Sequence, residues 1–430
     1  MERFSLDQSS VMLTSDAEDE AKSRVGQGKP CLCVFSKEEV MFWIAGILNN
    51  ASYVLLNAGA KEIAPSAVGW VYVCNVFPSF FTKLSGPYWL HRVPYRTRAK
   101  VIGFCMALSF SLVALGQWTD SLFLQFFGVA VTSFQAGFGE VSFLALSAFY
   151  PDSRRVLTAW SSGTGVAGIF GYAFVSFFLY LLKVPFVVAL ITANVFPLVW
   201  ALTVYRMLPW SAIDREGKTR GPPNVAGTIE NVELIPSDNR SSDGNDPANS
   251  ATATMTFRER LSSTLALWKY MVPLFVVYFS EYAIQSGVWA AIGFPITSKE
   301  SRNKFYELSN WAYQVGVFLS RSSGTLWKAN LKAIWALPFL QVCMFFFFWF
   351  DAYYMFWYNW SLLFPAFFVG LIGGLVYVQA FSLLADSVDE SKKEFSLSAA
   401  SIADSVGILM SNVCGIWIQK ALYTYHGIQD

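Results

Sequence analysis

Charged residues are scarce in this sequence. Lys, Arg, Asp and Glu together make up 14% of its 430 residues, whereas a soluble globular chain usually carries about 25%. So few charges cannot cover several soluble domains, which excludes an ordinary cytosolic protein and a disordered one. The 31 basic residues nearly balance the 30 acidic ones, so the net charge does not indicate a nucleic-acid partner.

Histidine and cysteine are too few to build a reactive centre. Only His91 and His426 are present, and neither lies in an apolar run. The six cysteines show no zinc-type spacing, and no Ser-His-Asp set can be assembled. We therefore predict no enzyme activity, no catalytic residue, no metal and no cofactor. Cys31 and Cys33 precede the first apolar run and leave palmitoylation open.

Apolar residues, in contrast, make up 54% of the chain. A helix needs about 20 mostly apolar residues to cross a bilayer core of about 30 Å. The sequence predicts an all-α membrane protein with about eleven such helices, and ten or twelve remain open. The eleven runs cover residues 40–60, 66–84, 101–116, 122–150, 157–182, 184–208, 265–289, 304–320, 331–350, 355–384 and 395–418.

Two polar segments divide these runs. We expect residues 1–39 to be a disordered N-terminus, and residues 209–264 to be a disordered linker between a six-helix bundle (40–208) and a five-helix bundle (265–418) with a short tail (419–430). If the N-terminus is cytosolic, the cytosolic loops and span ends carry twelve Lys and Arg residues, Lys83 among them, and the other side carries five. The positive-inside rule then predicts a cytosolic N-terminus and linker. This layout is typical of a major facilitator-type transporter.

Several local motifs follow one another in a specific order. They are Asn49-Asn50-Ala51-Ser52-Tyr53, Gly137-Phe138-Gly139-Glu140-Val141, Trp160-Ser161-Ser162-Gly163-Thr164-Gly165, Val276-Val277-Tyr278-Phe279-Ser280-Glu281-Tyr282, Tyr313-Gln314-Val315-Gly316 and Ile402-Ala403-Asp404-Ser405-Val406-Gly407. In this order they resemble the battenin family of lysosomal membrane proteins, from about residue 42 to residue 415.

The resemblance implies a major facilitator-like fold in the lysosomal, late endosomal or vacuolar membrane. The activities that it implies are export of glycerophosphodiesters, transport of basic amino acids and control of lumenal pH. The chain departs from the vertebrate pattern in its short first lumenal loop, residues 61–65, and in lacking a C-terminal prenylation box. The loop after the second span also lacks the Gly-x-x-x-Asp-Arg signature of the facilitator superfamily.

Three carboxylates, Glu140, Glu281 and Asp404, lie well inside apolar runs. An ionisable side chain at mid-bilayer costs about 2.5–3.5 kcal/mol even on lenient scales, so each needs a partner or a watery cavity. In facilitator folds the first, fourth, seventh and tenth spans line the central cavity, and helical spacing adds polar neighbours to the faces of the carboxylates. The predicted substrate or proton pathway comprises Asn49, Asn50, Tyr53, Glu140, Tyr278, Glu281, Tyr282, Gln285, Gln314, Arg321, Gln379 and Asp404.

Structural roles remain open for two of these residues. Arg321 lies near the end of its run and can extend its side chain to the interface, and Asp404 can serve as a hydrogen-bonding contact between helices. Asn359 begins a glycosylation sequon close to the membrane, and its use is open.

Two functions from different classes fit the sequence. The first is a transporter that moves a small polar metabolite across the lipid bilayer with the help of a proton gradient. The second is a membrane-embedded trafficking or scaffold factor without transport activity. The linker carries an acidic dileucine pattern, the kind that clathrin adaptors read, at Glu230, Leu234 and Ile235. A water-accessible cavity lined by the carboxylates favours transport, whereas a solidly packed helix interior favours a scaffold.

Overall fold

The computed structural model describes residues 36–64, 68–208, 210 and 257–428. Contacts divide the chain into residues 1–37 and residues 38–430, and nearly all described residues belong to the second unit. The regular structure of the described residues is entirely helical, which confirms the predicted fold class. Glu230, Leu234 and Ile235 of the sorting pattern, like Cys31 and Cys33, lie outside the described residues.

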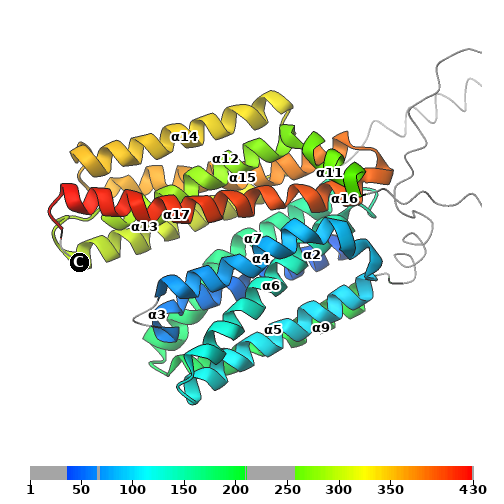
Figure 1. Ribbon diagram of the computed structural model, residues 1–430, viewed down its shortest axis with the longest axis horizontal. Coiled ribbons are helices and arrows are strands. Elements are labelled where there is room, and N and C mark those ends of the chain that lie inside the picture. Colours follow the sequence, from blue (N-terminus) through cyan, green and yellow to red (C-terminus); the bar gives the residue numbers. More distant parts are fainter. Residues whose placement is uncertain (1–35, 65–67, 209, 211–256, 429–430) are drawn as a thin grey trace, which may run out of the picture. The chain divides into compact units, whose positions relative to one another are not determined.

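The first half of the bundle precedes the linker. It contains α2 (Lys37–Ala58), α3 (Ala60–Ile63), α4 (Val68–Trp89), η1 (Leu90–Arg92), α5 (Tyr95–Trp118), α6 (Leu122–Ser147), α7 (Ser153–Ser176), η2 (Phe177–Leu181), α8 (Phe186–Ala193) and α9 (Val195–Met207). In Figure 1 these helices run from blue to green and lie together in the lower part of the view. Most connections between the long helices are short, so successive helices run back and forth.

The second half follows the linker. It contains α11 (Phe257–Ala266), α12 (Trp268–Ala283), η3 (Ile284–Val288), η4 (Trp289–Ala291), α13 (Lys299–Arg321), α14 (Leu331–Tyr354), η5 (Trp360–Leu362), α15 (Leu363–Ser387), α16 (Glu390–Ala400) and α17 (Ile402–Tyr425). Figure 1 draws them from green to red, in the upper part of the view. We call the end of the bundle where α9 stops and α11 starts the linker end.

Several helix boundaries differ from the predicted ones, and two of the differences change the domain limits. Helix α11 occupies residues that were assigned to the linker, and α17 continues to Tyr425, so that little of the predicted tail remains. Short polar side chains fix several helix starts. Asp152 accepts a hydrogen bond from the backbone N of Arg155 at the start of α7, and Asn330 accepts one from Ala333 at the start of α14. Both are N-caps, which satisfy backbone donors that have no partner within the helix.

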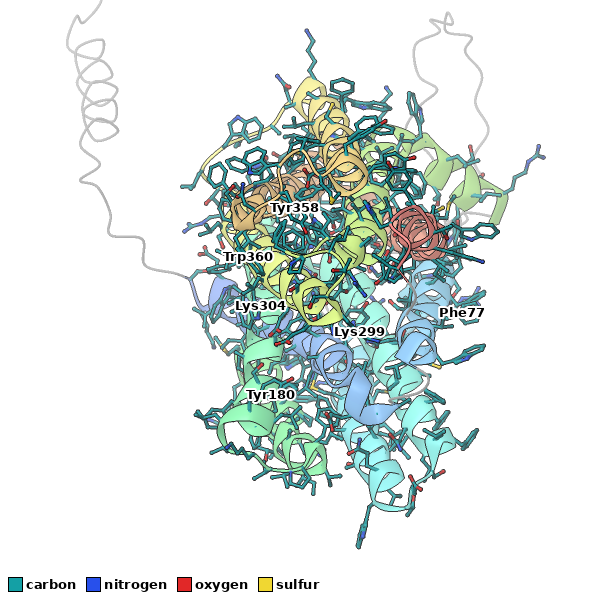
Figure 2. All side chains as sticks on the ribbon, turned by 90° about the vertical axis from the view of Figure 1, so that its left-hand side faces the viewer. Phe77, Tyr180, Lys299, Lys304, Tyr358 and Trp360 are labelled. Carbon is teal, nitrogen blue, oxygen red and sulfur yellow. The ribbon has the colours of Figure 1, made fainter. Side chains whose placement is uncertain are left out.

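Among the described residues, eight helices are long and apolar enough to cross a membrane, and a ninth results if α11 and α12, bent by 65°, form one span. Helices α4 and α13 are not in this group, although with 22 and 23 residues they too can cross about 30 Å at about 1.5 Å per residue. Large apolar side chains such as Phe77 and Tyr180, 51% and 74% exposed, point outward, as Figure 2 shows. This exposure suits contact with lipid.

The two halves repeat one packing pattern. A Cβ atom at Gly163 of α7 would collide with the carbonyl oxygen of Trp43 in α2. In the second half, a Cβ atom at Gly407 of α17 would meet the carbonyl oxygen of Phe275 in α12. Glycine is required at both crossings because only it lets the two backbones approach this closely.

The repeat continues one contact further along the same helices. Gly171 of α7 faces Val54, and Gly415 of α17 faces Ser286. In each half the two glycines are eight residues apart, and the residues that they face are eleven apart. The α2–α7 pair and the α12–α17 pair are therefore equivalent in register, a repeat that matching of residue identities does not reveal.

Candidate functional site

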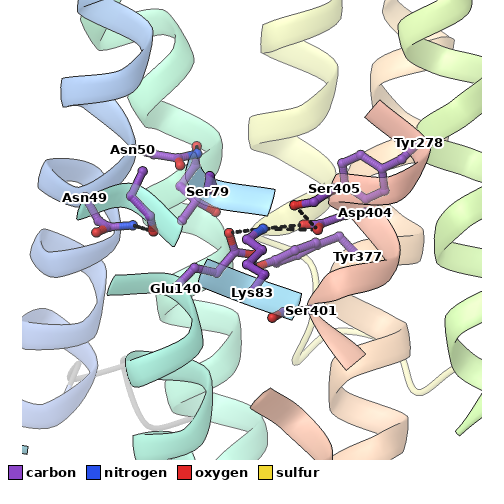
Figure 3. Close-up of polar contacts among 12 residues, drawn as sticks. Asn49, Asn50, Ser79, Lys83, Glu140, Tyr278, Tyr377, Ser401, Asp404 and Ser405 are labelled. Atoms are coloured by element: carbon purple, nitrogen blue, oxygen red, sulfur yellow. Dashed lines mark hydrogen bonds and ion pairs between the residues drawn. The ribbon is translucent and has the colours of Figure 1, made fainter. Parts of the chain in front are cut away.

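A lysine lies between two carboxylates at the boundary between the halves. Lys83 of α4 places its Nζ 2.7 Å from Oε2 of Glu140 in α6 and 3.0 Å from both carboxylate oxygens of Asp404 in α17. The three side chains are only 5%, 14% and 6% exposed. Figure 3 shows the lysine reaching from the first half toward the second. Ion pairs as enclosed as these are little screened by salt.

Two hydroxyls complete this group of charges. The hydroxyl of Tyr377, on α15, donates to Oε1 of Glu140 at 3.0 Å. Ser405 donates to Oδ1 of Asp404 at 3.1 Å. We call these five residues, Lys83, Glu140, Tyr377, Asp404 and Ser405, the Lys83 cluster; they join two helices of each half.

Arg321 lies beside the Lys83 cluster. It is in the last turn of α13, where the negative end of the helix dipole favours a cation. Its Nη1 donates to Oγ1 of Thr164 at 2.7 Å, and its Nη2 donates to the hydroxyl of Tyr278 at 2.9 Å. The guanidinium also lies 4.3 Å from the ring centroid of Tyr377, a cation–π contact. Arg321 therefore contacts the opposite half of the protein and does not extend to the membrane–water interface.

Glu281 of α12 is the most deeply buried of the three carboxylates, with 1% exposure. Its Oε1 accepts a hydrogen bond from the hydroxyl of Tyr313 at 3.1 Å, while its Oε2 has no hydrogen-bond partner among the described residues. The Oε2 atom lies against Gly373 of α15. An unpaired carboxylate oxygen in such surroundings is costly and marks the group as a candidate for binding a proton or a ligand.

Asn49 occupies the equivalent position in the first half. It lies six residues after Trp43, as Glu281 lies six after Phe275, and it lies against Gly139 of α6. Unlike Glu281, it has a hydrogen-bond partner at each polar atom of its side chain, since its Nδ2 donates to Ala136 O at 3.0 Å and its Oδ1 accepts from Gln135 at 2.8 Å. The repeat thus places a neutral amide in one half and a carboxylate in the other.

Several other predicted residues lie near this boundary. Asn50 donates to Thr164 O at 3.4 Å, and Tyr282 stacks on Tyr278 with ring centroids 6.2 Å apart. Tyr53 and Gln285 are only partly buried, and Nε2 of Gln285 has no partner among the described residues.

Two predicted glutamines pack between helices. Gln314 lies against Gly168 of α7, where it contributes to the contact between the halves. Gln379 does not reach the charged groups. It donates to Trp327 O at 2.8 Å and accepts from Ala329 N at 3.1 Å, so it holds the connection between α13 and α14. These hydrogen bonds give Gln379 a structural role.

Five members of this network, Ser405 among them, were not predicted from the sequence. Lys83 was counted as a cytosolic charge at the end of its run, but α4 continues to Trp89 and buries it at 4% exposure. Tyr377, Tyr313 and Thr164 were also missed, because a hydroxyl does not interrupt an apolar run. A signal for Lys83 was present in the sequence, since Phe80 and Phe81 precede it closely and Leu84 follows it. Among the described residues no His, Cys, Asp and Glu group is suited to a metal ion.

Another interaction joins the halves at the linker end. Nη1 of Arg260, on α11, donates to Tyr88 O at 3.1 Å and lies 3.0 Å from Nδ1 of His91. Burial and the positive charges of Arg260, Arg92 and Arg98 lower the pKa of His91 from 6.5 to about 4. The imidazole is thus neutral at ordinary pH, which lets it accept a hydrogen bond from the guanidinium.

The fold is that of the major facilitator transporters. The Escherichia coli fucose:proton symporter matches with a TM-score of 0.53 and 13% identity, over 91% of this chain and 92% of its own. The human organic anion transporter MFSD10 matches with a TM-score of 0.56 and 12% identity, over 91% of this chain and 96% of its own. At these identities the likeness concerns the fold.

Sequence comparison identifies the family. The model of the CLN3 protein family matches residues 40–425. Protein BTN1 of Yarrowia lipolytica is 31% identical and covers 89% of this chain and 94% of its own length. Battenin of the dog, Canis lupus familiaris, is 31% identical and covers 88% of this chain and 90% of its own. The chain therefore belongs to the CLN3 family of multi-pass membrane proteins, which confirms the resemblance to battenin.

Proposed function

We propose that this protein is a transporter that moves a small polar metabolite across the lysosomal, late endosomal or vacuolar membrane. The observation that carries the proposal is the polar network between the halves. In an inert membrane scaffold, burying three carboxylates, a lysine and an arginine at this boundary would cost stability without benefit. In a transporter the same groups bind substrate and protons near the midplane.

The charges suggest the substrate class. Arg321 donates to two neutral hydroxyls, and among the described residues no ion pair joins it to a carboxylate, so its charge is available to an anion. A guanidinium recognises phosphate through parallel hydrogen bonds. The stacked rings of Tyr278 and Tyr282 suit a quaternary ammonium group. We propose a glycerophosphodiester as substrate, with basic amino acids and lumenal pH as the alternative links that the family resemblance implies.

Glu281 is the proposed proton carrier. The substitution Glu281→Gln keeps the size and the hydrogen bond from Tyr313 but removes titration. We expect the variant to fold, because a neutral amide costs less to bury than a carboxylate, and to lose most of its efflux activity. Efflux of glycerophosphodiesters from isolated vesicles, normalised to protein abundance, measures this.

A matched control for this variant is Asp351→Asn. Asp351 is also buried, at 3% exposure, but it accepts a hydrogen bond from Trp357 N at 2.7 Å at the far end of α14. Its variant should transport normally per molecule. Normal efflux from the Glu281→Gln protein at every lumenal pH would remove Glu281 from the mechanism.

The scaffold alternative depends on the linker. The adaptor pattern at Glu230, Leu234 and Ile235 lies outside the described residues, and recruitment of clathrin adaptors there stays a prediction. The cytosolic position of the N-terminus and linker is likewise a proposal, supported by the distribution of Lys and Arg.

A further inference from the structure

Polar contacts between the halves gather toward the linker end. Near the surface, the hydroxyl of Tyr95 donates to Glu394 at 2.6 Å, and Arg154 lies 3.5 Å from Asp386. The carboxylates of these outer pairs are 33% and 44% exposed. Interactions as exposed as these contribute little to the free energy that holds the halves together. Arg260 and Arg321 also donate hydrogen bonds across the boundary. Of all these contacts, those of the Lys83 cluster depend on buried carboxylates, which a proton can neutralise.

The Lys83 cluster is asymmetric with respect to the boundary. Lys83 and Glu140 belong to the same half, so their ion pair survives any separation of the halves. The ion pair of Lys83 with Asp404 and the hydrogen bond from Tyr377 to Glu140 cross the boundary. Separation of the halves must break both, and the ion pair is the stronger contact because it is charged on both sides.

The cluster also carries an excess negative charge, because one ammonium faces two carboxylates. A proton on Asp404 would make the cluster neutral, remove the charge–charge attraction between Lys83 and Asp404 across the boundary, and leave Lys83 paired with Glu140, its nearer partner. The other titratable or charged groups that act on these residues are Tyr53 of α2, Tyr278 and Glu281 of α12, Arg321 of α13 and Tyr377 of α15. Of these, only Arg321 carries a fixed positive charge.

We propose that Lys83, Glu140 and Asp404 form a proton-operated latch between the halves, closed while both carboxylates are ionised and released when Asp404 takes up a proton. This latch rests on the proposed transport function, because it requires that the halves separate at the linker end during transport. Lys83 is a positioning residue in this scheme, because it acts by holding Asp404.

The latch can be tested without any substrate. Spin labels are attached through cysteines at Thr97 of α5 and Ser391 of α16, both exposed at the linker end, in a chain whose native cysteines are replaced. The labelled protein is placed in lipid nanodiscs, where both faces experience the same pH. Double electron–electron resonance then measures the distance between the labels at neutral and at acidic pH.

At neutral pH the expected distance between the labels is short. In acid the population with the longer distance should grow about tenfold or more, which corresponds to a change of about 1.4 kcal/mol in the free-energy difference between the closed and open forms. Asp404→Asn should show the long distance at both pH values. Lys83→Met should invert the dependence, because two facing carboxylates repel at neutral pH and acid relieves the repulsion. A merely structural lysine would not produce this inversion.

Two further variants make the test decisive. Lys393→Met is the matched control, because Lys393 pairs with Glu390 inside α16 at 2.5 Å and does not bridge the halves; it should behave like the unmodified protein. Glu140→Gln leaves a single neutral ion pair, so the short distance should persist to lower pH, which supplies a readout if Asp404→Asn does not fold.

The outcomes separate the latch from the transport function. Distances that do not respond to pH, or a Glu140→Gln protein that opens in acid like the unmodified one, would overturn the latch even if efflux is normal. Conversely, pH-driven separation in a protein that transports none of the tested metabolites would support the latch and count against the proposed substrate.

Discussion

Arg260 illustrates how a single side chain ties the start of the second half to the first. Its guanidinium bonds to backbone carbonyls at the end of α4, Pro87 O at 3.3 Å and Tyr88 O at 3.1 Å. The last carbonyls of a helix lack partners within the helix, and a cation there also benefits from the helix dipole. The neighbouring His91 ring can accept from Arg260 only while it is neutral, so this contact depends on pH.

The sign of that dependence follows from the lowered pKa of His91. The unfolded chain binds a proton at His91 below about pH 6.5, whereas the folded protein does so only below about pH 4. The contribution of His91 to stability is therefore constant above pH 6.5 and is lost as the pH falls from 6.5 toward 4. In the Arg260→Met variant the pKa of His91 should rise toward 6.5. NMR titration of the imidazole signals measures the shift, and an unchanged pKa would show that Arg260 has no influence.

At the scale of helices, close crossings set the geometry of each half. The α2–α7 and α12–α17 crossings need glycine at Gly163 and Gly407, where a Cβ would collide with a backbone carbonyl. A backbone atom cannot rotate away as a flexible side chain can. Substitution at these positions must therefore move one helix away from the other.

We expect Gly163→Ala and Gly407→Ala each to destabilise the fold by about 1–3 kcal/mol, the usual cost of overpacking. A lower thermal unfolding temperature in detergent would confirm this. Ala173→Leu is the control, because Ala173 lies on the same helix α7 but is exposed. If Gly163→Ala unfolds at the same temperature as this control, the close contact is not a constraint.

The number and order of the helices were predictable because apolar runs of membrane length are visible in a single sequence. The burial of Lys83 was not predictable, because a lysine at the end of an apolar run fits a loop charge as well as a buried partner of a carboxylate. Only the positions of Glu140 and Asp404 on other helices decide between the two readings. The equivalence of Asn49 and Glu281 was hidden for a similar reason, since the halves share contacts with glycine rather than residue identities.

On the scale of the whole molecule, the half that follows the linker has one long helix fewer than a symmetric pair of six-helix bundles would need. The bent α11–α12 pair and the α16–α17 pair each count as one pass. If α4 and α13 also cross, the described helices make eleven passes, an odd number that would put the two ends on opposite faces of a membrane. The polar character of α13, which carries Lys299, Glu300 and Arg302 in its first turns, is the reason that hydropathy alone does not include it.

This topology gives the final prediction. A tag after Met1 should be accessible from the cytosol, and a tag after Asp430 should be protected in intact vesicles. Protease digestion before and after detergent treatment distinguishes the two positions, and a tag placed within residues 211–256 serves as the internal control, since the linker should lie on the same side as Met1. If both end tags are cleaved in intact vesicles, the number of passes is even, and the first helices to question are α4 and α13, which hydropathy does not include. In that case the Lys83 cluster or the Arg321 contacts could not lie at a boundary enclosed by the bilayer, and the transport proposal would lose its central observation.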